Sequence, residues 1–219
     1  MRHLRAFLVG LALTAILVAI SYVWIDRPVA FFVHDRFAGV RIFVDLTRIP
    51  EILAAIAGTV FVLVALYVLI RKPSTRLASI LLLCVVSVTV GSQIKDQLKI
   101  VFGRTWPETW FRGNPSLIHD GVFGFNFFRS GISYSAFPSG HMTVTCAFAA
   151  VIWFGLPRYR PVWAVMVALV AIGLIGANYH FVSDVIAGAF VGASTGRAAV
   201  LLWDAGLPKI GVASGSKYS

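Results

Sequence analysis

The 219-residue chain alternates long apolar runs with short polar connections. A helix needs about 20 apolar residues to cross a bilayer core of roughly 30 Å. Six runs reach or approach this length, and they cover residues 6–24, 51–70, 77–93, 139–156, 162–177 and 184–203. The pattern predicts an all-α, polytopic membrane bundle of about six transmembrane helices, formed by residues 1–219 as a single domain.

The first apolar run permits a second interpretation. Residues 19–21, Ala-Ile-Ser, have the small side chains of a signal-peptide cleavage site. We favour an uncleaved helix, because the apolar run continues through Trp24 without a helix-breaking residue.

Three segments outside the runs have distinct compositions. Residues 25–50 alternate charges of both signs with aromatic and aliphatic side chains, which predicts an amphipathic helix lying in the membrane interface. Residues 103–137 are rich in glycine and aromatic side chains, so they form either an interfacial aromatic belt or a lid that shapes a substrate site. Residues 204–219 are rich in glycine and serine, which is typical of a disordered tail.

Composition limits the class of protein. A hydrophobic fraction of 58% and a mean hydropathy of +0.85 exclude an ordinary soluble domain. The net charge is +10, but the basic residues are scattered between apolar runs, which favours membrane lipids with anionic groups over nucleic acid as partners. Cys84 and Cys146 lie inside apolar runs, and no Cys/His cluster has metal-ligand spacing. We therefore expect no disulfide, no metal and no cofactor.

Basic residues also predict the orientation in the membrane. The amino terminus, residues 71–76, residues 157–161 and the tail after Leu207 carry Lys or Arg without Asp or Glu. The positive-inside rule assigns such segments to the cytoplasm. Six crossings then put the ends of the third and fifth runs, and the starts of the fourth and sixth, on the periplasmic or outer face of the inner (plasma) membrane.

One of these boundaries carries the sequence AFPSGH at residues 136–141. Pro138 and Ser139 are typical of a helix start, and apolar residues follow from Met142. A helix N-terminus binds anions through its free N–H groups, and Gly140 lets a phosphate oxygen approach the backbone. Ser139 and His141 add a hydroxyl and an imidazole beside this anion site.

A second boundary carries NYHFVSD at residues 178–184. His180 and Asp184 are four residues apart, which predicts that both lie on one face of a helix. The carboxylate then accepts from one ring nitrogen and leaves the other free to attack an electrophile. Either motif alone is more often structural than catalytic, but their shared membrane side favours a joint site.

These motifs resemble those of the type 2 phosphatidic acid phosphatase (PAP2) family, which shares its site with vanadium haloperoxidases. The family's three blocks are Lys-x6-Arg-Pro, Pro-Ser-Gly-His and Ser-Arg-x5-His-x3-Asp. The middle block is complete at residues 138–141, and His180 and Asp184 match the third block. The resemblance covers about residues 95–192.

The resemblance implies a lipid phosphatase that needs no metal. His180 would attack phosphorus to form a phosphohistidine, Asp184 would support its positive charge, and His141 would protonate the leaving group. The residues that would hold the phosphate are Lys99, Arg104, Ser139 and Gly140. Two alternatives remain open: a transferase that passes the phosphoryl group to another lipid, and a catalytically weakened membrane protein that binds lipid phosphate.

Two arginines of the family pattern are missing. Gly173 and Leu174 stand where the third block has Ser-Arg, and Trp106 stands where the first block has its arginine. The implied phosphate site is therefore short of guanidinium groups.

Arg104 is the nearest replacement for the first of these arginines. It lies five residues after Lys99, about 140° around a helix, so it reaches the same anion only if the helix ends near Gly103. We predict that it does so, and Arg112 and Arg129 are the reserve candidates.

Overall fold

The computed structural model describes residues 1–52, 76–110 and 113–205, together with positions 55, 58, 59, 62, 63, 66 and 67. The long helices are α1 (Arg2–Ile20), α2 (Asp26–Phe37), α5 (Arg76–Phe102), α7 (Gly140–Gly155), α8 (Arg160–Gly176) and α9 (Val182–Asp204). The shorter elements are the π-helical turn η1 (Ser21–Ile25), α3 (Arg41–Thr47), α6 (Leu117–Asp120) and the 3-10 turns η2 (Ile132–Tyr134) and η3 (Pro157–Tyr159). No β-strand occurs among the described residues.

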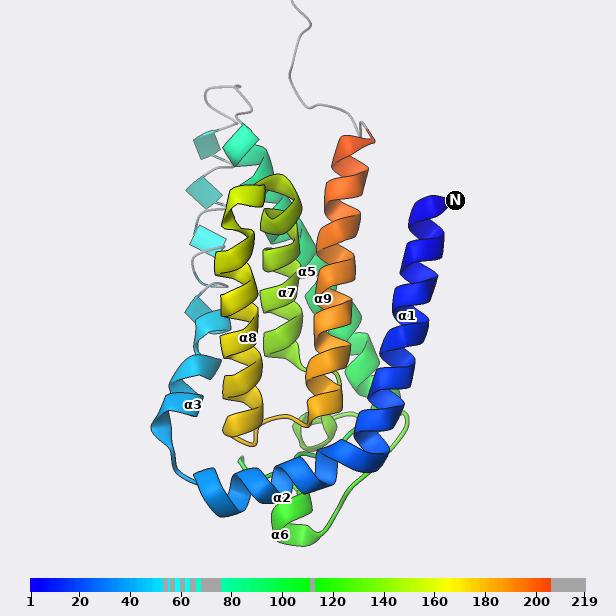
Figure 1. Ribbon diagram of the computed structural model, residues 1–219, viewed down its shortest axis with the longest axis vertical. Coiled ribbons are helices and arrows are strands. Elements are labelled where there is room, and N and C mark those ends of the chain that lie inside the picture. The colour runs from blue at the N-terminus through cyan, green and yellow to red at the C-terminus, as the bar shows by residue number, and fades with distance from the viewer. Residues whose placement is uncertain are drawn as a thin grey trace, which may run out of the picture.

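Apolar helices run along the length of the bundle (Figure 1). Within the described ranges, four helical segments are long and apolar enough to cross a membrane: Arg2–Phe37, Arg76–Phe102, Pro157–Gly176 and Val182–Asp204. The shorter apolar helix α7 lies among them. The all-α membrane bundle expected from the sequence is confirmed. The expected helix over residues 51–70 and the tail over 204–219 lie largely outside the described residues.

The amino-terminal helix changes direction at η1. α1 runs along the bundle, and after this turn α2 crosses beneath one end of it (Figure 1). A π-helical turn is a common cause of such a bend. α2 buries Ala30 and Val33, whereas Phe31 and Phe32 are exposed. The exposed side of α2 thus carries aromatic rings, and the amphipathic interfacial helix expected over residues 25–50 stays a prediction.

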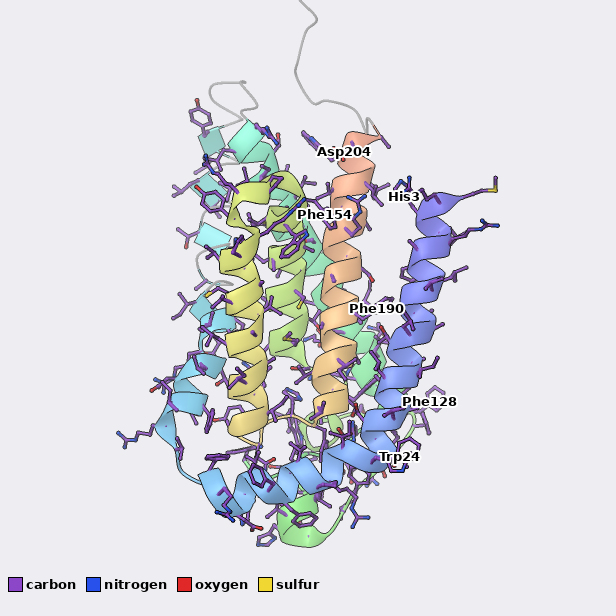
Figure 2. The ribbon with its side chains drawn as sticks, viewed as in Figure 1. His3, Trp24, Phe128, Phe154, Phe190 and Asp204 are labelled. Atoms are coloured by element: carbon purple, nitrogen blue, oxygen red, sulfur yellow. The ribbon has the colours of Figure 1, made fainter. Side chains whose placement is uncertain are left out.

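Large aromatic side chains remain outside the bundle at the end crossed by α2. Figure 2 shows Trp24 and Phe128 there, near the junction of α1 and α2. Trp24 is 67% exposed and Phe128 is 78% exposed. Exposed aromatic side chains at the end of a helical bundle are typical of a membrane interface.

Three glycines spaced four residues apart bring α9 against α7. A Cβ atom added to Gly188 or Gly196 would lie 2.5 Å from the backbone oxygen of Ser139 or Ala147, and one on Gly192 would lie closer still to that of Thr143. No side chain fits there, so the two backbones are in direct contact. Small residues allow this close packing between membrane helices.

Chain direction brings distant segments to one end of the bundle. α5 and α8 end, and α7 and α9 begin, at the end that α2 crosses (Figure 1). Both histidine motifs therefore meet beside the last turn of α5.

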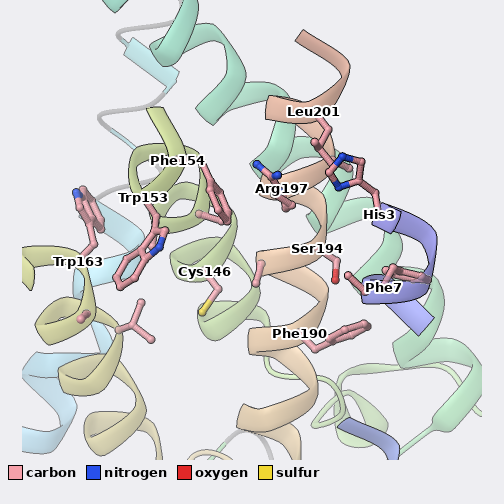
Figure 3. Close-up of a pocket in the computed structure, with 17 residues that line it drawn as sticks. His3, Phe7, Cys146, Trp153, Phe154, Trp163, Phe190, Ser194, Arg197 and Leu201 are labelled. Carbon is pink, nitrogen blue, oxygen red and sulfur yellow. The ribbon is translucent and has the colours of Figure 1, made fainter. Parts of the chain in front are cut away.

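A larger cavity, of about 670 Å³, lies nearer to the opposite end between α1, α7, α8 and α9 (Figure 3). Apolar side chains such as Phe7, Trp153 and Phe190 dominate its wall, and His3 and Arg197 also line it. None of the residues in the two histidine motifs lines this cavity. The candidate chemistry therefore belongs to a different, smaller pocket.

Candidate active site

A pocket of about 470 Å³ opens where α5, α7 and the α8–α9 connection meet. Four residues expected from the sequence line it: Lys99, Gly140, His141 and His180. The structure thus brings together both histidines, a lysine and the start of α7, although they are up to 81 positions apart in the sequence.

The start of α7 forms the floor of this pocket. Ser139 is the N-cap residue, and its hydroxyl accepts from the Met142 backbone N–H at 3.4 Å, as the sequence predicted for a helix start. The Ser139 side chain is fully buried and does not line the pocket. Its expected contact with phosphate is therefore not supported by this geometry. The first N–H groups of the helix have no carbonyl partner within it and make this end attractive to an anion.

Lys95 is a pocket residue that the sequence analysis did not select. It lies one helical turn before Lys99 on α5, and both side chains line the pocket. A Cβ atom on Gly140 would lie 3.2 Å from Lys95 Cδ and 3.7 Å from its Nζ, so the glycine leaves room for this lysine over the start of α7. Two ammonium groups therefore flank the pocket in place of guanidinium groups.

His141 faces an acidic residue that the sequence analysis also missed. Its Nε2 lies 3.6 Å from Oε1 of Glu51, another pocket residue. The side chain of His141 is 33% exposed, so it remains accessible from the pocket. This position suits a group that exchanges protons with a bound molecule.

The pairing of His180 with Asp184 differs from the expected helical face. α9 begins at Val182, so His180 precedes the helix, whereas Asp184 lies in its first turn and accepts from the Phe181 backbone N–H at 3.0 Å. Nδ1 of His180 lies 3.5 Å from Oδ2 of Asp184, which is longer than an ordinary hydrogen bond. The carboxylate nevertheless faces Nδ1 and leaves Nε2 available. Catalytic hydrogen bonds often tighten only when substrate is bound.

His180 is almost completely buried, with 4% of its surface exposed. Burial lowers the pKa of its imidazole to about 4, although the neighbouring carboxylate opposes this shift. The ring is therefore neutral near pH 7, which is the form that has a free lone pair for nucleophilic attack.

Arg104 does not lie where the sequence predicted. α5 ends at Phe102, and Gly103 has a φ of +51°, so the helix stops where expected. The Arg104 side chain, however, is fully buried and does not line the pocket. Its guanidinium donates to Asp184 Oδ1 at 2.6 Å and to Asp26 Oδ2 at 2.7 Å. Carboxylates accept from both of its terminal nitrogens, so in place of the expected role in holding phosphate the structure has a buried ion-pair cluster behind the site.

Aromatic rings enclose this guanidinium. Its Cζ lies 4.3 to 5.4 Å from the ring centroids of Phe181, Phe125, Tyr22 and Phe123. Two of these rings come from the 103–137 connection, so part of that aromatic-rich segment lines the interior and is neither belt nor lid. Cation–π contacts of this kind are favourable once the cation is desolvated.

The positions of the missing family arginines carry other side chains. Leu174 is fully buried in an apolar cluster with Met142 and Val185. Trp106 lines the pocket, where its ring centroid lies 5.2 Å from that of His180 and its Nε1 donates to the Ile132 carbonyl at 2.8 Å. An aromatic wall thus stands beside the candidate nucleophile.

Of the two reserve candidates for the missing charge, the described one lies away from the pocket. Arg129 stacks on Tyr134 at 4.2 Å and does not line the pocket. Arg112 lies outside the described residues.

No group of three or more His, Cys, Asp or Glu side chains among the described residues is arranged to hold a metal ion. The polar groups that line the pocket include two histidines, two lysines and the Asn114 amide, and Glu51 is the one carboxylate among its described lining residues. These groups suit the oxygens of an anionic ligand.

Comparison with known proteins identifies the family. Residues 75–206 match the PAP2 superfamily, and this region contains both histidine motifs and all of α5, α7, α8 and α9. The chain belongs to the PAP2 superfamily. Asp26 and the rest of the amino-terminal helix precede the region that defines this PAP2 match.

Two curated relatives of this PAP2 protein are named lipid A 1-phosphatase. The protein from Rhizobium etli is 36% identical over 78 residues, which is 35% of this chain and 34% of the relative. The protein from Rhizobium johnstonii is 36% identical over 83 residues, which is 37% of this chain and 34% of the relative. The matched region thus spans about a third of the length of these relatives.

A solved PAP2 structure has the same fold. It is the crystal structure of a transmembrane PAP2-type phosphatidylglycerolphosphate phosphatase from Bacillus subtilis. The TM-score is 0.62 at 18% identity, over 93% of this chain and 98% of the other. This likeness extends the shared architecture to nearly the whole chain.

Proposed function

We propose that this protein is a membrane lipid phosphatase that hydrolyses a phosphate monoester or pyrophosphate through a phosphohistidine intermediate. The observation that carries the proposal is the pocket in which His180, backed by Asp184, lies with His141, Lys95 and Lys99 at the start of α7. Membership of the PAP2 superfamily and the lipid A 1-phosphatase relatives support the same class of reaction.

In the first half of the proposed reaction, Nε2 of His180 bonds to phosphorus while the bond between phosphorus and the leaving oxygen breaks. His141 gives its proton to that oxygen, and Asp184 stabilises the positive charge that develops on the His180 ring. In the second half, water attacks phosphorus, gives a proton to His141 and expels the His180 imidazole. Both histidines then return to their starting states.

Lys95, Lys99 and the N–H groups at the start of α7 hold the phosphate oxygens in this proposal. The ammonium groups and the helix dipole neutralise charge as it moves from phosphorus to the leaving group. Ser139 contributes by capping the helix and so fixing Gly140, rather than by direct contact. The proposed set of binding residues therefore differs from the sequence-based one by gaining Lys95 and losing Arg104.

Phosphate release from purified protein tests the proposed function. We expect detergent-solubilised protein to release phosphate from at least one of phosphatidic acid, phosphatidylglycerol phosphate, a prenyl pyrophosphate and a lipid A-like phosphate. Release should continue in excess EDTA, because the proposed reaction assigns every step to histidine, lysine and backbone N–H groups. The measurement is inorganic phosphate against time, with the His180→Ala protein prepared in parallel to exclude a contaminating phosphatase.

The other outcomes of this experiment separate the alternatives. Transfer of labelled phosphate to an added acceptor lipid, without release to water, would identify a transferase. Tight lipid binding without turnover would identify a binding protein. Loss of activity in EDTA would contradict the metal-independent mechanism.

We also propose that the site faces the periplasm or outside of the inner (plasma) membrane. Support comes from the opposite end of the bundle, where Arg2, Arg5, Arg158 and Arg160 lie without a nearby acidic residue in sequence. His119, in α6, lies at the site end of the bundle and has a side chain that is 76% exposed.

Thiol labelling tests this orientation. His119→Cys should react with a membrane-impermeant thiol reagent in intact cells, whereas Arg158→Cys should react only after the membrane is opened. Both native cysteines are buried, so the unmodified protein supplies a low background. The reverse labelling pattern would overturn the orientation.

A further inference from the structure

The buried cluster behind the pocket contains a carboxylate from outside the region that matches the PAP2 superfamily. Asp26, the first residue of α2, is 1% exposed. It lies 158 positions before Asp184 in the sequence and 49 before the start of the family match. Neither its position nor its neighbours in the sequence suggested a link to the histidine motifs.

Asp26 is bonded to the first turn of the helix that carries Asp184. Its Oδ1 accepts from the Ser183 backbone N–H at 3.0 Å, and its Oδ2 accepts from the Ser183 hydroxyl. A free N–H at the start of α9 is thereby satisfied by a carboxylate from α2. Asp26 thus fixes the residue next to Asp184 in both position and rotation.

Asp26 also shares Arg104 with Asp184. Arg104 donates through Nη2 to Asp26 at 2.7 Å, and through Nη1 to Asp184 at 2.6 Å and to the Ser183 hydroxyl at 2.5 Å. All three charged side chains have no exposed surface. Planar guanidinium geometry allows one arginine to orient both carboxylates at once.

The cluster is unbalanced in charge. It contains one cation and two carboxylates, so it retains a net negative charge beside the neutral His180 ring. In a site without exposed surface, this charge has a strong effect on a neighbouring ring that becomes positive. A phosphorylated imidazole is such a ring. The net negative charge of the cluster therefore favours the positive ring of the phosphohistidine over the neutral ring of free His180.

We infer that Asp26 is a positioning residue for the His180–Asp184 pair, acting through Arg104 and Ser183. It offsets the charge of Arg104 so that the Asp184 carboxylate remains available to the His180 ring. The amino-terminal helix is thereby part of the reactive site, although it contributes no residue to the pocket described around His180. This inference rests on the proposed phosphohistidine reaction.

The test is the kinetics of Asp26→Asn, which keeps the shape of the side chain and removes its charge. We expect kcat to fall at least tenfold, which corresponds to about 1.4 kcal/mol in the barrier, with KM close to that of the unmodified protein. A purely structural role would lower the amount of folded protein and leave the kcat of the folded fraction unchanged. Asp35→Asn, an exposed carboxylate on the same helix, is the matched control and should behave like the unmodified protein.

A charge-balanced double variant provides the second measurement. Asp26→Asn with Arg104→Gln removes one charge of each sign and restores the net negative charge, so its kcat should be no lower than that of Asp26→Asn alone. Independent effects would instead multiply. This variant also replaces Asp26→Asn as the test if the single variant does not fold.

The outcomes distinguish this inference from the proposed function. An unmodified protein that releases no phosphate from any lipid would overturn the function itself. An active unmodified protein with an unchanged kcat in Asp26→Asn would overturn only the role of Asp26. Loss of folded protein in both Asp26 variants would also overturn it, because Asp26 would then serve stability rather than the reaction.

Discussion

His180→Ala is expected to abolish phosphate release, with a loss of at least about 1,000-fold in kcat/KM, or about 4 kcal/mol of transition-state stabilisation. The alanine has no lone pair to attack phosphorus, and the remaining pocket only binds the phosphate. The measurement is kcat/KM on the best lipid of the panel. His119→Ala, which removes an exposed histidine of the connection between α5 and α7, is the control and should retain full activity.

His141→Ala provides the contrast within the site. It should slow release by about 100- to 10,000-fold for a lipid leaving group that needs a proton, and by less for a nitrophenyl phosphate whose leaving group does not. Near-normal turnover in His180→Ala would refute the phosphohistidine mechanism. An equal loss in His141→Ala for both leaving groups would refute its role as the acid.

Arg104→Ala is expected to destabilise the folded protein by about 3–5 kcal/mol. Asp26 and Asp184 would be left buried without their shared cation, and desolvated charges without partners are strongly unfavourable. Thermal unfolding of the purified protein in detergent measures this loss as a lower Tm. Arg129→Ala, which removes an exposed arginine, is the control and should keep the original Tm.

Lys95→Met separates stability from phosphate binding. Lys95 lines the pocket and its side chain is 17% exposed, so this variant should lower kcat/KM at least about tenfold without changing Tm. If Arg104→Ala instead keeps its Tm and only loses affinity for substrate, the phosphate-binding role predicted from the sequence would be restored.

Local sequence patterns predicted the helices well. Apolar runs marked α7, α8 and α9 to within about two residues, and a proline followed by serine marked the start of α7. Both signals are local, because membrane helices satisfy their backbone polar groups within one segment. The bend at η1 was not predicted, since nothing in the composition of residues 21–25 distinguishes it.

The pocket residues that were predicted from the sequence belong to short motifs. His141 and His180 line one pocket because the chain direction puts the starts of α7 and α9 at the same end. Lys95 was overlooked, although its spacing of four from Lys99 was a signal that both lie on one helix face. No sequence spacing indicates Glu51, because its place in the pocket depends on how distant segments pack.

The orientation of the Arg104 side chain could not be predicted from the sequence. Its spacing of five residues from Lys99 correctly predicted that the helix ends near Gly103. The end of a helix does not by itself determine the direction in which the next side chain points. That direction depends on Asp26, which lies 78 positions away in a segment assigned to the membrane interface. The buried guanidinium points toward the carboxylates that neutralise it, and the sequence did not identify Asp26 as one of them.

The backbone contact between α7 and α9 has a mechanical consequence. Gly188 and Gly192 of α9 contact the backbone of the first turns of α7 directly. α7 carries His141 and α9 carries Asp184. Contacts between side chains can adjust by changing rotamer, but a contact between two backbones has no such freedom. When a bilayer of different thickness tilts the helices, the two should tilt together. In the proposed reaction His141 is the proton donor and Asp184 supports the nucleophile, so we expect the distance between them to change little with the composition of the surrounding lipid.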